Sequence, residues 1–321
     1  MQKTGLLLLL TVMLTATLVL AQQPLTPATP DASGIVETTA NVPAVRFQTP
    51  TASDLYCAGF LSKVSVPNAN YVNGGLQSPH STKFGNGELV YLAGSGYQAG
   101  QLYSIIREMR DVNEYETYLG QKKLLAAVGH PYGEIGRVRV VDTRSHSAIA
   151  QVELSCDPIN PGDLAVPFVE KQPVMFRKPA HFDRFAPANG NLSGRIVLAK
   201  DFDTVLGTGA KLYMNMGSNQ GVKVGDYFRV VRSYTADLEN PVDSLSFKAQ
   251  IAEDTQAHPP TFEANRFTKD TGPNIHVRDL PRRAVGEVVV LGVTPTSSSA
   301  MVVFALEDVH VGDNVELDEQ Q

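Results

Sequence analysis

The chain lacks tryptophan, and aromatic residues make up only 7% of its 321 residues. Aromatic platforms, on which many sugar-binding sites depend, are therefore scarce. The chain also has no run of lysines or arginines, and its formal net charge is −6. An acidic chain without a basic patch repels phosphate backbones, so we expect no nucleic-acid binding.

Long apolar runs are absent after residue 20, so no later segment is expected to cross a membrane as a helix. Residues 1–21 combine Lys3, an uncharged apolar stretch and the small residue Ala21, the layout of a cleaved secretory signal peptide. A retained anchor is the alternative, but the apolar stretch is shorter than the ~20 residues that span a bilayer. We predict export to the periplasm or outer surface of a bacterium.

Cysteine is limited to Cys57 and Cys156. In an exported chain an even pair predicts a disulfide, which would stabilise the fold by roughly 4–5 kcal/mol through loop entropy. Two buried free thiols are the alternative. Neither cysteine has a second cysteine or a histidine at ligand spacing, so a metal site is not expected.

An internal repeat dominates the rest of the sequence. Residues 136–163 match residues 286–313 at a constant offset of 150, and residues 89–107 match 211–232 with short insertions. A weaker match pairs residues 59–62 with 190–193. The matches predict two copies of one module, over residues 54–168 and 190–317, with a tail at 318–321.

Proline-rich stretches separate and flank these modules. Residues 22–53 are rich in proline, threonine and alanine and are predicted to form a disordered tether. Residues 169–189 form a connector, and residues 233–284 form a long loop inside the second module.

Short runs of β-branched residues bounded by glycine, proline and aspartate predict strands, so the fold class is mainly β. We expect two tandem duplicated small β-barrel or sandwich modules, with a short helix within residues 114–128 of the first. Glycine and aspartate clusters between strand runs predict hairpin or bulged turns, in which aspartate makes an Asx-type backbone bond. The predicted structural turn residues are Gly94, Gly100, Gly162, Asp163, Gly217, Gly221, Gly225, Asp226, Gly312 and Asp313.

The pattern over residues 209–232 is a strand, a Gly-Ser-x-x-Gly-Val-x-x-Gly-Asp turn and a strand that ends in Arg232. It resembles the β-rich C-terminal module of bacterial flagellar assembly protein T and similar domains of secreted LysM-associated envelope proteins. The first module departs from it, with Gln101 in place of Asp226, and the chain has no LysM repeat. The resemblance implies a role in envelope or surface-appendage assembly.

Patterns that indicate chemistry are missing. The seven histidines form no metal-binding pair, and neither a Gly-x-Ser-x-Gly elbow nor a phosphate-binding loop occurs. We predict no catalytic residue, cofactor or metal ligand. Two arginines at equivalent strand ends, Arg107 and Arg232, are expected to pair with a carboxylate of their own module rather than bind an anionic partner.

The sequence therefore favours a non-enzymatic cell-envelope protein that acts as a binding or scaffolding module. Its partner would be an unidentified envelope protein or cell-wall component. One alternative is a peptidoglycan- or polysaccharide-binding protein. Another is a secreted hydrolase whose site is built from the insertions at 108–135 and 233–285.

Overall fold

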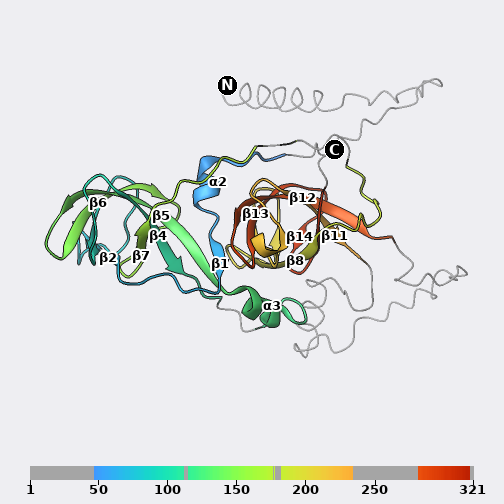
Figure 1. The fold of residues 1–321 in the computed structure, drawn as a ribbon, viewed down its shortest axis with the longest axis horizontal. Coiled ribbons are helices and arrows are strands. Elements are labelled where there is room, and N and C mark those ends of the chain that lie inside the picture. The colour runs from blue at the N-terminus through green and yellow to red at the C-terminus, as the bar shows by residue number, and fades with distance from the viewer. Residues whose placement is uncertain (1–46, 112–114, 176, 178–181, 234–280, 319–321) are drawn as a thin grey trace, which may run out of the picture. The chain divides into compact units, whose positions relative to one another are not determined.

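The computed structural model describes residues 47–111, 115–175, 177, 182–233 and 281–318. The strands form two six-stranded antiparallel barrels, and the fold class is mainly β, as predicted. Barrel 1 runs from blue-green to yellow-green in Figure 1, and barrel 2 from yellow-green to red. The predicted signal peptide, most of the predicted tether and most of the predicted long loop lie outside the described residues.

Barrel 1 closes in the order β5-β4-β7-β2-β3-β6, because β6 also pairs with β5. A further strand, β1, extends β5 outside the closed ring. These strands are β1 (Phe60–Ser62), β2 (Tyr71–Gly75), β3 (Leu89–Ala93), β4 (Leu102–Glu108), β5 (His130–Thr143), β6 (Ser147–Ser155) and β7 (Leu164–Pro167).

Barrel 2 closes in the order β10-β13-β12-β11-β15-β8, and β9 and β14 form a separate pair. These strands are β8 (Ser193–Ala199), β9 (Val205–Leu206), β10 (Lys211–Met214), β11 (Tyr227–Arg232), β12 (Arg283–Val293), β13 (Ser298–Ala305), β14 (Val309–His310) and β15 (Asn314–Leu317). A 3-10 helix, η1 (Ser218–Gln220), follows β10.

The duplication extends to the pairing register. Tyr103 lies opposite Val138 in barrel 1, and Phe228 lies opposite Val288 in barrel 2. Register shifts interrupt the two pairs of strands at the same place. The alternation of strand residues places one set of side chains inside each barrel, where they form separate cores.

Two sequence predictions about the repeat need correction. The weak match of residues 59–62 with 190–193 is not structural, because β1 lies outside its ring whereas β8 is part of the other ring; the counterpart of β8 is β2. The glycine clusters between β3 and β4, and between β10 and β11, do not close hairpins. Neither pair of strands is adjacent in its barrel, so these segments cross from one part of the barrel to another.

Residues 47–62 form an ordered segment that we call the strap; it contains α2 (Ala52–Tyr56) and β1. The tether predicted for residues 22–53 therefore ends before residue 47. The Gln48 amide donates to the Val303 carbonyl at 2.8 Å, and the Phe47 ring lies 5.1 Å from that of Phe304. Thr51 caps α2 by accepting from the Asp54 amide, so local sequence defines the helix start.

The strap and the helical insertion both pack on the outer face of barrel 2. Tyr213 of β10 donates to the Ala58 carbonyl, and the Lys211 ammonium lies 2.5 Å from the Asp54 carboxylate. The predicted helix forms as α3 (Gln121–Val128), and Gln121 donates to the Val197 carbonyl of β8. The insertion of the first module therefore serves as packing surface for the second barrel.

Candidate functional site

A pocket of about 350 Å³ lies on the outside of barrel 1. Its floor consists of outward-facing residues of β4, β5 and β7, which alternate with the core residues of the same strands. The strap, the segment between β1 and β2, and the connector supply its other walls. We call this space the strap pocket. Its main apolar lining residues are Phe60, Val66, Ile106, Val166, Phe168 and Val169.

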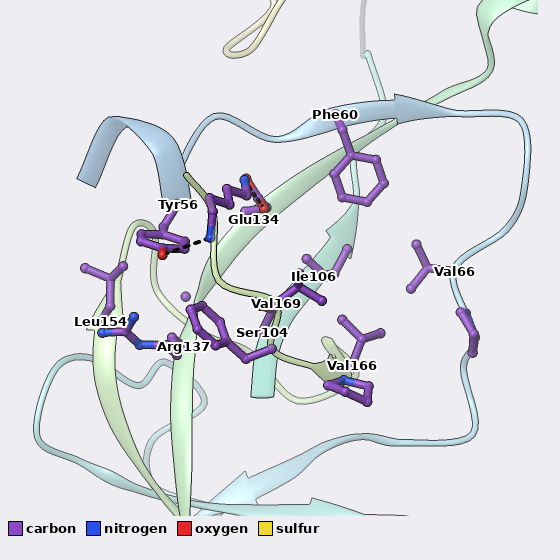
Figure 2. Close-up of a pocket in the computed structure, with 15 residues that line it drawn as sticks. Tyr56, Phe60, Val66, Ser104, Ile106, Glu134, Arg137, Leu154, Val166 and Val169 are labelled. Carbon is purple, nitrogen blue, oxygen red and sulfur yellow. Dashed lines mark hydrogen bonds and ion pairs between the residues drawn. The ribbon is translucent and has the colours of Figure 1, made fainter. Parts of the chain in front are cut away.

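The charged side chains of the strap pocket gather toward one end of it (Figure 2). Glu134, Tyr56 and Arg137 lie toward one end, whereas Phe60 and Val66 lie toward the other. The chain thus builds an apolar space with charged side chains at one side. This composition is typical of small-molecule and apolar-segment binding sites.

Glu134 of β5 is held in a salt bridge at the polar end. The Lys171 ammonium of the connector lies 2.6 Å from its Oε1 and donates to its Oε2 at 2.8 Å. The Gly59 amide of the strap donates to Oε2 at 3.1 Å. Burial raises the pKa of the Glu134 carboxyl, although the Lys171 charge acts in the opposite direction. The ion pair thereby joins strap, barrel 1 and connector.

Arg137, three residues further along β5, has a different environment. Its guanidinium carbon lies 5.1 Å from the Phe168 ring centre and 5.6 Å from that of Tyr56. The Nε atom lies 3.3 Å from Glu153 Oε2 but makes no hydrogen bond within the described part of the chain. The aromatic rings therefore fix an arginine whose hydrogen-bonding capacity is largely unused.

The repeated arginines form intramodular ion pairs, as expected. Arg107 donates through Nε and Nη2 to both carboxylate oxygens of Asp163, each at 2.7 Å. Arg232 makes the same bidentate contact with Asp313, at 2.9 and 2.7 Å. Each arginine also donates to a backbone carbonyl of its own barrel. The pairs fasten β4 to the turn before β7 and β11 to the turn before β15.

The predicted turn residues lie at the ends of the barrel strands, away from the strap pocket. The carboxylates of Asp163, Asp226 and Asp313 each accept from the backbone amide three residues earlier. The predicted turn glycines have positive φ angles, with the exception of Gly217, whose φ is −138°. Those with positive φ are Gly94, Gly100, Gly162, Gly221, Gly225 and Gly312.

Cys57 and Cys156 form the predicted disulfide, with Cα atoms 5.6 Å apart. It attaches the end of α2 to the segment that follows β6. The strap is thereby covalently held to barrel 1 while its other face packs on barrel 2. The bond is also consistent with an oxidising compartment.

Sequence reasoning missed the pocket residues Glu134, Arg137 and Lys171. The offset of 150 that defines the repeat makes Glu287 of barrel 2 the equivalent of Arg137 in barrel 1. The charge is therefore reversed at equivalent positions of two otherwise similar strands. That reversal was the available signal. Lys171 gave none, because a lysine in a proline-rich connector is ordinary.

Among the residues that the structure describes, no group of three or more acidic, histidine or cysteine side chains could hold a metal ion. Within the same ranges, no helix has the length and apolarity needed to cross a bilayer. No protein-family model matches the chain, and no curated protein matches it either.

Proposed function

We propose that the chain is an exported, non-enzymatic binding protein of the bacterial cell envelope, and that the strap pocket is its binding site. The observation that carries this proposal is the pocket itself. An apolar space of about 350 Å³ with a fixed arginine at one end falls within the usual size range of ligand sites.

The setting of the pocket supports a binding role. Its walls come from three segments that are distant in sequence, and the disulfide and the Glu134–Lys171 pair hold those segments together. A site fixed in this way loses little conformational entropy when a partner binds. The disulfide and the signal-like N-terminal sequence support export.

The resemblance of residues 209–232 to envelope modules favours the same compartment. A role in envelope or surface-appendage assembly is the most specific function that this resemblance supports. The pocket lies on barrel 1, whereas the resemblance is carried mainly by barrel 2. We infer that barrel 2 provides the scaffold against which the strap forms the binding site.

Photocrosslinking in the producing bacterium tests the proposal. A photoreactive amino acid replaces Val169, which is 74% exposed and lines the pocket. The matched control replaces Val141, which is 54% exposed on β5 and does not line it. We expect an adduct from position 169 only, recovered in the envelope fraction. Equal crosslinking at both positions, or a chain confined to the cytoplasm, would contradict the proposal.

A further inference from the structure

We propose that the strap pocket binds a single-chain amphiphile with a carboxylate head, such as a fatty acid, with the carboxylate on Arg137 and the alkyl chain between strap and barrel. This inference rests on the proposed binding function and names its ligand class. It depends on three features of the pocket, which concern charge, shape and size.

The charge balance at the polar end favours an anion. Arg137 and Arg139 both form ion pairs with the same carboxylate, Glu153, so this group of three carries one excess positive charge. Arg139 has a second partner in the Gly100 carbonyl, at 3.1 Å. Lys171 is already neutralised by Glu134. Arg137 is therefore the cation of this cluster with capacity for a new partner.

The guanidinium of Arg137 is also oriented in advance. Its side chain is only 28% exposed, and the rings of Tyr56 and Phe168 pack close to it. Such contacts restrict an arginine without occupying its N–H groups, which lie in the plane of the guanidinium. A carboxylate can accept two parallel hydrogen bonds from this arrangement.

The opposite end has no polar group, among the described residues that line it, to satisfy a second charged or hydroxylated head. Phe60, Val66 and Val166 provide aliphatic and aromatic surface there (Figure 2). The transfer of each methylene group of an alkyl chain out of water is favourable by about 0.8 kcal/mol of free energy. The pocket therefore favours an extended apolar tail over a sugar, whose hydroxyls would lose their hydrogen bonds to water.

The volume sets the length of the tail. A water-sized group takes about 30 Å³, so a pocket of about 350 Å³ holds on the order of a dozen methylene-sized groups. A single chain of that length fits, whereas the two chains of a membrane phospholipid would not. Dodecanoate is accordingly the probe of choice.

Calorimetric titration of the disulfide-bonded chain, at probe concentrations below micelle formation, tests the ligand class. Dodecanoate is compared with 1-dodecanol, which has the same tail without charge. We expect one dodecanoate per chain and weaker binding of dodecanol. Arg137→Gln should weaken dodecanoate by about 10- to 100-fold, the loss of a charge-assisted hydrogen bond, and leave dodecanol unchanged.

Arg144→Gln is the matched control, because it also removes a guanidinium that pairs with a carboxylate, but Arg144 pairs with Asp142 rather than Glu153 and does not line the pocket. It should leave dodecanoate binding unchanged. Val169→Asp is a second variant at an exposed position that should not disturb folding. Its negative charge should weaken dodecanoate more than dodecanol.

The outcomes separate this inference from the proposed function. If position 169 crosslinks in cells but dodecanoate neither binds nor, when added before irradiation, suppresses formation of the adduct, the pocket binds something else and the fatty-acid inference is wrong. Equal affinity for dodecanoate and dodecanol, unaffected by Arg137→Gln, would overturn the role of Arg137. If position 169 gives no specific adduct and dodecanoate does not bind, the proposed binding function is itself wrong.

Discussion

Arg137 and Glu287 occupy equivalent positions in the duplicated strands but differ in charge and in environment. Arg137 of barrel 1 borders a pocket, whereas Glu287 of barrel 2 is 1% exposed. Both carboxylate oxygens of Glu287 lack a hydrogen-bond partner within the described residues, and the Arg177 guanidinium lies 3.9 Å away. Burial raises the pKa of Glu287 to about 8, and the nearby Asp318 acts in the same direction.

This shift makes a prediction about stability and pH. Between the ordinary pKa of 4.5 and about 8, the folded chain holds a proton that the unfolded chain has released. The free energy of unfolding should therefore decrease as pH rises through this window, by at most about 1.4 kcal/mol per pH unit for this one group. The contribution is complete below the lower pKa and lost above the upper one.

Glu287→Gln should remove that part of the pH dependence, because the amide does not titrate. Urea unfolding midpoints measured between pH 5 and 8.5 provide the test. The variant should gain stability relative to wild type toward pH 8.5. Parallel pH profiles for the two proteins would show that Glu287 ionises in the folded chain as readily as in water.

At the scale of elements, the strap packs against both barrels, and its packing depends on one glycine. Gly59, between α2 and β1, has a φ of +69°. A Cβ atom there would lie 2.5 Å from the Tyr213 hydroxyl and 2.6 Å from the Tyr132 carbonyl, one in each barrel. Its own amide also donates to Glu134. Only glycine allows the strap to pass this closely between its two neighbours.

Gly59→Ala should therefore lower the free energy of unfolding by about 2–4 kcal/mol, from backbone strain and overpacking together. Gly207→Ala is the control, since Gly207 is exposed, has no positive φ, and a Cβ atom added there would meet no other atom within 4 Å. That control should stay within about 0.5 kcal/mol of wild type. Equal effects of the two substitutions would mean that the strap does not pack as described.

The pattern of polar and apolar residues differs between β6 of barrel 1 and β13 of barrel 2, because different segments cover their outer faces. In β6, residues 151–155 alternate between polar and apolar, and the outer face is partly exposed. In β13, residues 301–304 are all apolar and all buried. The outer side of β13 packs against the strap residues Leu55 and Ala58. A continuous apolar run thus marks a strand buried on both faces.

For the whole molecule, the strap and the connector each contact both barrels, so the barrels are expected to unfold together. On the connector, Lys171 pairs with Glu134 of barrel 1, while the Tyr227 hydroxyl of barrel 2 accepts from the Arg177 amide and donates to the Met175 carbonyl. The disulfide adds a covalent link between residues 99 positions apart. A closed loop of that size restricts the unfolded chain strongly.

The double substitution Cys57→Ser and Cys156→Ser should lower the free energy of unfolding by about 2–5 kcal/mol. Denaturant unfolding followed by circular dichroism measures this change. A reducing agent should destabilise the wild-type chain by a similar amount and have no effect on the double variant. A reductant effect that persists in the double variant would show that it does not act through this bond.

The local sequence determined a large part of this molecule. Strand patterns of period two and glycines at turns could be predicted because each depends on a residue and its near neighbours. The repeat placed Arg107 and Arg232 at equivalent strand ends, and the disulfide followed from the count of two cysteines in a chain predicted to be exported. The duplication itself could be recognised because both copies retain the Gly-Asp turn before the last strand and the same strand register.

Tertiary structure decided which strands are adjacent, where the strap lies and where a pocket forms. The hairpin assignment failed because turn residues report a change of direction but not the strand that comes next. The strap pocket could not be predicted from the sequence, because Phe60, Arg137 and Lys171 come from three separate segments. The residues around any one of them give no indication of the other two. Burial and charge at such a site arise from long-range packing, which the sequence encodes only through the whole fold.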